Sequence, residues 1–312
     1  MTMPGRHIIL SIAAGVFAAA LTLSALSMTL GGVVLSSLAQ LPIFLVGLAL
    51  GSQAAAIATA SSFAVASLLI RIEFGFFFAL AVGLPATVLV RQALLTRIED
   101  GQRRWYPPAG LLLVALGLVL AVAATALPAA LWPDEGQVSR ARAVLETLPA
   151  ELRPADLSPE AADRLVRFTL GFLPGFLGIG FFVLLALNAG LAQFILVRAG
   201  LNLRPTPALS DLALPAWFAT GAAIAGVGAL LPGISGAVGG NLVLICAVGF
   251  AFAGLAVVHA MVLNSPARGP LLAAAYGAIF LFAPAIVVVM LLGIAEPWTR
   301  LRERFAGPAP RL

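Results

Sequence analysis

The chain has 312 residues, of which 61% are hydrophobic and only 10% are charged, and its formal net charge at pH 7 is +5. A water-soluble domain carries charge on about a quarter of its residues, so this composition excludes a soluble globular protein and predicts an integral membrane protein. All 18 basic residues are arginines in short clusters between apolar runs, and no long basic surface with interleaved aromatic residues accompanies them, so nucleic-acid binding is not expected.

Nine apolar runs are long enough to cross a bilayer, because a helix of about 20 residues spans the hydrocarbon core and leaves no backbone group unpaired. We therefore expect an all-α polytopic transmembrane helical bundle with eight or nine membrane segments, built as a single transmembrane domain over residues 1–312. In chain order the runs cover residues 8–28, 33–50, 54–70, 74–95, 108–131, 168–197, 214–231, 241–263 and 270–294.

The first run carries a stripe of small residues at helical spacing. Small side chains let two helices approach closely in lipid, where no hydrophobic drive holds helices together. We expect the stripe to pack against another helix of the same chain or, alternatively, to dock onto another membrane subunit. Its members are Ser11, Ala14, Gly15, Ala18 and Ala19.

Arginine-rich segments indicate the orientation, because short cytoplasmic loops are enriched in arginine. The segment 91–104 holds four arginines and follows four expected spans, so the N-terminus is predicted to be cytoplasmic. We expect a multi-pass protein of the bacterial cytoplasmic membrane. Nine crossings would place the arginine-rich tail 296–312 outside, against the same rule. One apolar segment is therefore expected not to cross, and the candidates are the glycine-rich run 221–240, as a re-entrant segment, and the tight pair around Gly51.

The polar segment 132–167 is expected to form an extracytoplasmic insertion. Its stretch 138–152 is predicted to be a short amphipathic helix on the outer surface. Ser158, Pro159 and Glu160 match an N-cap, a proline at the first helical position and an acid in the first turn. A helix is predicted to begin there and to run into the sixth span as one long rod.

Five polar residues lie inside apolar runs. An unpaired polar group is costly in hydrocarbon, so each must face protein, water or a ligand. For each residue alone, a hydrogen bond between helices is a sufficient explanation. If several converge on one pocket, a small polar ligand is the better one. These candidate ligand-binding residues are Gln40, Asn188, Gln193, Asn241 and His259.

Arg71 and Glu73 stand in the very short turn expected between the third and fourth spans. One interpretation is a solvated turn. The other is a charged rim of the same binding cavity, where a guanidinium could pair with a carboxylate or phosphate group of a ligand.

Four prolines fall inside the apolar runs and are expected to kink them, because proline removes one helix hydrogen bond. Kinked helices can open cavities between neighbours. The prolines are Pro42, Pro85, Pro174 and Pro284.

Catalytic and metal-binding motifs are absent from the sequence, which has only His7 and His259 as histidines and Cys246 as its single cysteine. We expect no catalytic residue, no metal site and no cofactor, and the chain is not expected to be an enzyme. An intramembrane enzyme would have to use His259, Asn264 and Glu296.

Parts of the chain from its second apolar run to its end resemble a known family. The motifs of that family are similar to LPIFLVGLALG (41–51), FLPGFLGIGFFVLLALNAGLAQFILVR (172–198), AGLAVVHAMV (253–262) and GIAEPWTRLRERF (293–305). The family is the YybS-like group of predicted bacterial membrane proteins, whose function is unknown. One departure is Glu296 before Pro297, where the family usually has aspartate.

This group is distantly similar to the substrate-binding S components of energy-coupling-factor transporters. Those proteins capture vitamins and other small molecules within a helical bundle, and small residues on their first helix help to dock the coupling subunit. The resemblance implies an S-component-like bundle that binds or translocates a small molecule and docks through the stripe of the first run.

The alternative is a non-transporting membrane scaffold or envelope assembly factor that uses the segment 132–167 and the arginine-rich tail as contact surfaces. Besides the lipid bilayer, the expected partners are a small-molecule ligand and other membrane subunits.

Overall fold

The computed structural model describes residues 3–147 and 158–306. The described part is almost entirely helical, and its sheet is a two-stranded antiparallel hairpin of β1 (Thr96–Glu99) and β2 (Gln102–Trp105). The predicted all-α polytopic transmembrane architecture is thereby confirmed.

Two compact units make up the chain, and the division falls within two long continuous helices. These helices are α7 (Pro108–Leu131) and α9 (Pro159–Ala199), so each contributes residues to both units. The first unit comprises Met1–Leu118 and Phe181–Ala213, and the second comprises Val119–Gly180 and Leu214–Leu312.

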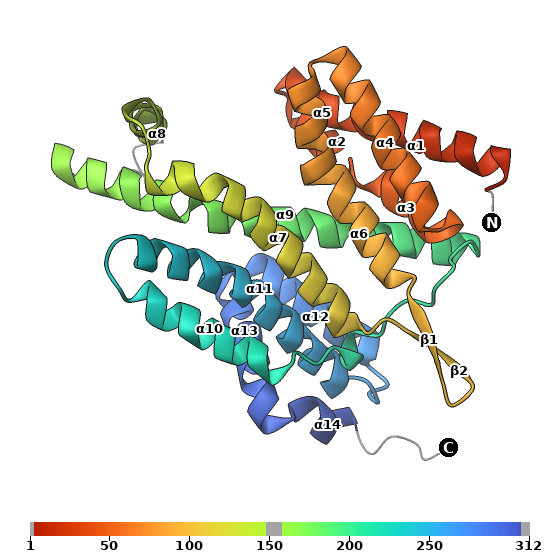
Figure 1. Ribbon diagram of the computed structural model, residues 1–312. Coiled ribbons are helices and arrows are strands. Elements are labelled where there is room, and N and C mark those ends of the chain that lie inside the picture. Colours follow the sequence, from red (N-terminus) through yellow and green to blue (C-terminus); the bar gives the residue numbers. More distant parts are fainter. Residues whose placement is uncertain (1–2, 148–157, 307–312) are drawn as a thin grey trace. The chain divides into compact units, whose positions relative to one another are not determined.

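The first unit is built around one central helix. Besides parts of α7 and α9, its helices are α1 (Gly5–Leu23), α2 (Leu30–Ser37), α3 (Leu41–Leu50), α4 (Ser52–Leu69), α5 (Ile72–Phe78) and α6 (Leu84–Ala93). The central helix is α4, which packs against α1, α3, α5 and α6 (Figure 1). Ala54, Ala55 and Ala58 of α4 are fully buried, and their small side chains permit this close packing.

Two expected spans of the first unit are interrupted helices. The run 33–50 consists of α2 and α3, and the run 74–95 consists of α5, a π-helical turn at Ala79–Gly83 and α6. Pro42 and Pro85 lie in the first turns of α3 and α6, and each lacks the N–H that would bond to the carbonyl four residues earlier. These prolines therefore begin new helical segments after a break.

The second unit is built around α11 (Ile234–Met261), which packs against α10, α13 and α14. The remaining helices of this unit are α8 (Glu135–Thr147), α10 (Ala216–Ala229), α12 (Arg268–Leu281), α13 (Pro284–Thr299) and α14 (Leu301–Ala306).

The backbones of α11 and α13 touch at two glycines. A Cβ added to Gly254 would lie 1.7 Å from the Val289 carbonyl oxygen, and one added to Gly293 would lie 1.8 Å from the Phe250 carbonyl oxygen. Residue numbers rise along one helix as they fall along the other, so α11 and α13 are antiparallel at this crossing.

The long rod predicted from the N-cap pattern is confirmed. The Ala161 N–H donates to Ser158 Oγ at 3.3 Å, and α9 then continues for 41 residues. At 1.5 Å per residue such a helix is about 60 Å long, roughly twice the hydrocarbon thickness of a bilayer. Part of α9 must therefore extend beyond the membrane. The predicted outer helix 138–152 corresponds to α8 up to Thr147, and its last residues lie outside the described part.

Among the described residues, seven helical segments are long and apolar enough to cross a membrane. The expected ninth span, 270–294, is not one continuous helix, because the chain bends by 118° between α12 and α13. The extended backbone of Phe282 (φ −131°) forms the break. If α12 and α13 count as one bent span, the total is eight.

The expected seventh span, 214–231, also differs from the structure. It contains α10, whose 14 residues fall short of the about 20 that cross a bilayer. The chain then reverses through Gly233, whose φ of 71° suits glycine, and α11 folds back onto α10. This turn lies inside the run 221–240 that the sequence marks as a re-entrant candidate.

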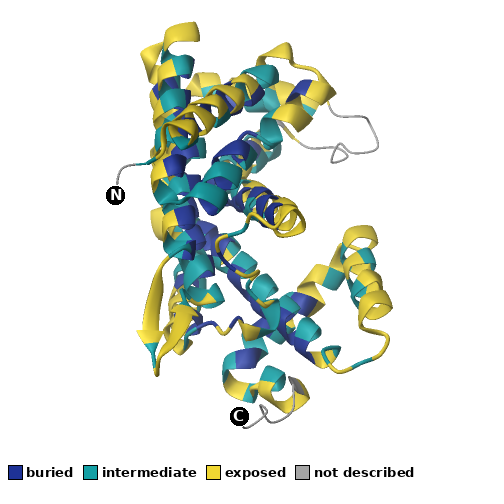
Figure 2. Ribbon diagram, turned by 90° about the vertical axis from the view of Figure 1, so that its right-hand side faces the viewer, coloured by how far each residue is buried: buried dark blue, intermediate teal, exposed yellow. Residues whose placement is uncertain are grey.

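Large apolar side chains cover much of the outer surface. Leu68 is 85% exposed and Phe280 is 88% exposed, and exposed and half-buried residues predominate along the helices (Figure 2). Apolar exposure on this scale suits contact with lipid tails rather than with water.

Candidate functional site

The break between α2 and α3 leaves a backbone carbonyl for a side chain to bind. Pro42 has no N–H for the Leu38 carbonyl, which instead accepts from the Leu41 N–H at 3.0 Å. In a continuous helix the Leu41 N–H would donate to the Ser37 carbonyl. Here the Ser37 carbonyl accepts instead from Asn188 Nδ2 at 2.8 Å. The Asn188 side chain, from α9, therefore ties α9 to the end of α2.

The π-helical turn before α6 leaves a second backbone carbonyl, that of Ala81, for a side chain to bind. Pro85 has no N–H for the Ala81 carbonyl four residues earlier. Gln40 Nε2 donates to this carbonyl over a long distance of 3.4 Å. Gln40 lies in the turn between α2 and α3, immediately before α3. Its side chain therefore links this turn to the π-helical turn before α6.

Both carboxamides keep an oxygen without a hydrogen-bond partner in the described part of the chain, namely Gln40 Oε1 and Asn188 Oδ1. Gln40 is 5% exposed and Asn188 is 1% exposed, so water reaches neither side chain freely. Asn188 Nδ2 makes a second bond to the Leu184 carbonyl at 2.8 Å, which fixes the nitrogen end of that carboxamide. A buried acceptor left unpaired costs about 1–3 kcal/mol, so these two oxygens are the strongest sign of a binding site.

A third carboxamide, that of Gln193, holds the loop that follows α9. Its Nε2 donates to the Arg204 carbonyl at 2.9 Å and to Thr206 Oγ1 at 3.3 Å. Gln193 therefore has a structural role at the end of α9.

Arg204 itself is buried, which its place in a loop does not suggest. Its Nη1 donates to the Ala93 carbonyl and its Nη2 to the Tyr106 carbonyl, both at 2.8 Å. Burial lowers the pKa of the Arg204 guanidinium below its ordinary value, yet a guanidinium stays protonated in proteins. Its positive charge faces the C-terminal end of α6, where the helix dipole is negative. The sequence gives no local signal for this contact, because both carbonyls lie about a hundred residues away.

In the second unit, Asn241 of α11 contacts α9 beside Pro174. Its Oδ1 accepts from the Gly175 N–H at 2.6 Å, and its Nδ2 donates to the Gly171 carbonyl at 2.8 Å. Asn241 is 5% exposed. Both polar atoms of its carboxamide are occupied by backbone groups, so this side chain locks α11 to α9.

His259 lies near the end of α11 and contacts α12. Its Nε2 is 3.0 Å from the Tyr276 hydroxyl oxygen, and the two rings pack edge to face. The contact joins α12, which has no buried residue of its own, to the rest of the second unit.

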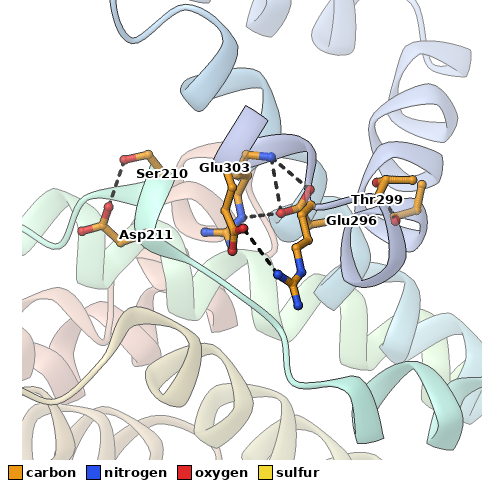
Figure 3. A network of polar contacts seen from close by, with 8 residues as sticks. Ser210, Asp211, Glu296, Thr299 and Glu303 are labelled. Carbon is orange, nitrogen blue, oxygen red and sulfur yellow. Dashed lines mark hydrogen bonds and ion pairs between the residues drawn. The ribbon is translucent and has the colours of Figure 1, made fainter. Parts of the chain in front are cut away.

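Glu296 is a buried acid that forms an ion pair at the end of α13. One carboxylate oxygen is 2.9 Å from Arg302 Nε, and the Arg302 backbone N–H lies 3.2 Å from the other. These contacts are the dashed lines at Glu296 in Figure 3. Arg300 adopts a left-handed conformation (φ 49°) between the two partners, and the resulting turn brings α14 back onto α11. Glu296 thus fixes the turn between α13 and α14.

Arg71 and Glu73 form an exposed pair at the start of α5. Arg71 Nε is 3.4 Å from a Glu73 carboxylate oxygen, and the two side chains are 75% and 69% exposed. Together with Ile70, Phe74 and Phe77 they line an open depression of about 410 Å³. A surface pair of this kind contributes little to stability.

The small-residue stripe of α1 lies against α4 within the first unit. Ser11, Ala18 and Ala19 have no exposed surface. A Cβ added to Gly15 would lie 2.2 Å from the Ala58 carbonyl oxygen. In the structure this face is occupied by a helix of the same chain.

The candidate residues are thus divided between the two units. In the first unit, Gln40 belongs to the turn 37–40 and Asn188 contacts that turn through the Ser37 carbonyl. Gln193 holds a loop of the same unit, and Arg71 and Glu73 lie on its surface. Asn241 and His259 make separate contacts in the second unit. In the described part of the chain, no group of three or more His, Cys, Asp and Glu residues comes close enough to hold a metal ion.

Comparison with known proteins gives a match at the level of the family alone. No curated protein and no solved structure matches the chain. The family model described as "Predicted membrane protein (DUF2232)" matches residues 16–296, which is most of the chain. The chain therefore belongs to this family of predicted membrane proteins.

Proposed function

We propose that the chain binds a small, uncharged molecule at the turn 37–40 of the first unit, in the manner of the substrate-binding S components of transporters. The observation that carries this proposal is the pair of buried carboxamide oxygens, Gln40 Oε1 and Asn188 Oδ1, which have no partner in the described chain. The proposed role is binding or translocation and involves no catalytic residue or cofactor.

The chemistry of the turn favours a hydrogen-bond donor as ligand. Both oxygens are acceptors, so they call for N–H or O–H groups. Among the described residues of the first unit, the buried polar ones include no acid that would neutralise a bound cation; they are Ser11, Gln40, Ser62, Asn188, Gln193 and Arg204. Burying a charge without a partner is far more costly than burying a neutral donor, so an uncharged ligand fits best.

The interrupted helices of the first unit also favour a binding site at the turn 37–40. In a membrane, interrupted helices are tolerated where they are buried in protein or line a cavity, and transporters commonly bind their substrates at such breaks. The first unit has one break between α2 and α3 and another before α6. Gln40 joins the two breaks through its bond to the Ala81 carbonyl.

We further propose the bacterial cytoplasmic membrane as the location, with the N-terminus in the cytoplasm. Four of the candidate spans precede the hairpin of β1 and β2. Arg204 supports an even number of crossings between α6 and the loop after α9, because it binds the carbonyl of Ala93 at the end of α6 and that of Tyr106 just before α7. Labelling of single introduced cysteines in a Cys246→Ser background would test this orientation.

The test of the binding role is to identify small molecules that co-purify with the protein in detergent, by mass spectrometry. Gln40→Met and Asn188→Leu remove the two oxygens and keep the approximate side-chain volume. Gln53→Met, at an exposed position in the first turn of α4, makes the same chemical change away from the turn. We expect one uncharged, donor-bearing compound to accompany the wild type and Gln53→Met and to be lost from the other two variants. Equal recovery from all four proteins, or no retained compound, contradicts the proposal.

The second candidate function is a membrane scaffold or assembly factor. The observation that favours it is the docking of α8 on the N-terminal part of α9, where Arg142 pairs with Asp163 and Arg167 with Glu135. These two ion pairs hold the polar helix α8 against the part of α9 that is expected to lie outside the membrane. Cross-linking from Val144, which is 63% exposed on α8, would test it in intact cells. No cross-linked envelope protein is expected if the chain acts only as a binding subunit.

A further inference from the structure

The hairpin of β1 and β2 is a compact basic element between two candidate spans. Its turn, Asp100 and Gly101, has φ values of 50° and 73°, as the tightest hairpin turns require. β1 begins three residues after the end of α6, and β2 ends three residues before the start of α7. The hairpin therefore lies at the membrane surface where these two helices end, whichever side that is.

One face of the hairpin concentrates positive charge. Arg97 and Arg104 are directly opposite each other, and like charges in this position repel. Glu99 on the same face contacts both: one of its oxygens pairs with Arg97 and the other is 3.0 Å from Arg104 Nε. The arginine side chains remain 77% and 62% exposed. Each guanidinium has five N–H groups, so most of these donors point to the surroundings.

The opposite face combines an apolar residue with a third arginine. Ile98 is paired with Arg103, and Thr96 with Trp105. Ile98 is 79% exposed, and the strands stand out as exposed arrows in Figure 2. A face with isoleucine, tryptophan and arginine suits the boundary between lipid tails and headgroups.

The base of the hairpin is held firmly. The Trp105 ring has the Arg103 guanidinium 6.0 Å from its centre and the Arg204 guanidinium 5.9 Å from it. Arg204 is in turn fixed to the Ala93 and Tyr106 carbonyls. A surface that is already ordered loses little entropy when it binds a partner.

We propose that this hairpin binds the phosphate headgroups of anionic phospholipids in the adjoining leaflet. The segment 91–104 has four arginines against Glu99 and Asp100, so its net charge is positive. Guanidinium forks match phosphate oxygens in a bidentate geometry. This assignment is independent of the small-molecule site, because it uses other residues.

Lipid binding to the purified full chain tests the proposal. Native mass spectrometry would count phosphatidylglycerol and phosphatidylcholine molecules retained at matched lipid concentrations. The test variant is the triple change Arg97→Gln, Arg103→Gln and Arg104→Gln. The control variant, Arg71→Gln with Arg140→Gln and Arg300→Gln, removes as many exposed charges elsewhere. We expect the hairpin variant alone to lose its preference for phosphatidylglycerol, with affinity reduced about tenfold or more.

Three outcomes overturn the proposal. The first is an unchanged lipid preference in the hairpin variant, and the second is an equal loss in the control variant. The third is displacement of the lipid by inorganic phosphate, which would show a simple anion site instead of a headgroup site. If the triple variant fails to fold, Arg103→Gln alone leaves the Glu99 contacts intact and should weaken phosphatidylglycerol binding about fivefold.

Discussion

Asn241 takes the place of a helix hydrogen bond of Gly175. In a continuous α9 the Gly175 N–H would donate to the Gly171 carbonyl, but the carboxamide of Asn241 stands between them and bonds to both, at 2.6 Å and 2.8 Å. Pro174 distorts the helix at this point. A side chain of α11 thus completes the backbone bonding of α9.

Replacing Asn241 with leucine should destabilise the protein by about 1–3 kcal/mol, because it leaves buried backbone groups of α9 without partners. The measurement is the thermal unfolding midpoint in detergent. Ser235→Ala, at an exposed position on the same helix, should leave the midpoint unchanged. An Asn241→Leu protein as stable as the wild type would show that α9 restores its own bond.

Gly254→Ala and Gly293→Ala should each destabilise the second unit by at least about 1–3 kcal/mol, the usual cost of overpacking. The added methyl groups would overlap backbone oxygens, so α11 and α13 would have to separate. Gly277→Ala is the matched control, because a Cβ there meets nothing within 4 Å and alanine favours helix. Unfolding midpoints of the three variants compare them directly. Tolerance of alanine at both crossing positions would contradict the contact between the backbones.

Glu296→Gln should cost about 1.5–3 kcal/mol, because it replaces the charged acceptor of the Arg302 guanidinium with a neutral one. Glu303→Gln is the control: Glu303 pairs with Arg300 at 3.9 Å while both side chains are mostly exposed, so its loss should cost less than about 1 kcal/mol. Limited proteolysis of the C-terminal segment would report the difference, with faster cleavage after Arg302 and Arg304 in the first variant. Equal cleavage of the two variants would mean that Glu296 does not hold the turn.

Arg204→Leu should loosen the ends of α6 and α7, since it removes both carbonyl contacts, and Arg204→Lys should restore only part of the stability because an ammonium lacks the planar fork. Hydrogen exchange of the amides near Ala93 and Tyr106 is the measurement, and it should accelerate in the order wild type, lysine, leucine. The charge persists across neutral pH, so the ranking should be the same at pH 6 and pH 8. Identical exchange in all three proteins would contradict the clamp.

The long helix α9 was predictable because its signal is local: Ser158, Pro159 and Glu160 mark the start, and apolar periodicity carries the rest. The break between α12 and α13 was not predictable in this way, because hydropathy gives the length of an apolar run and not its direction. The sequence predicts a kink within a span at Pro284, whereas this proline starts a helix after the extended residue Phe282.

The hairpin was missed, although its turn signal is present in the sequence. Asp100 followed by Gly101 is the strongest short signal for a tight hairpin, but the surrounding arginines are equally typical of a simple cytoplasmic loop. The carboxamides of Gln40 and Asn188 were identified as buried polar groups that need partners. Their partners could not be predicted, because they are backbone carbonyls 41 and 151 residues away.

The bond from Gln40 to the Ala81 carbonyl has a consequence for motion in the bilayer. If α3 slid or rotated away, the Ala81 carbonyl would face hydrocarbon with nothing to replace the lost donor, since no water is at hand there. Displacement of α3 therefore carries an energetic penalty unless the π-helical turn moves with it. We therefore expect the two interrupted spans to move together.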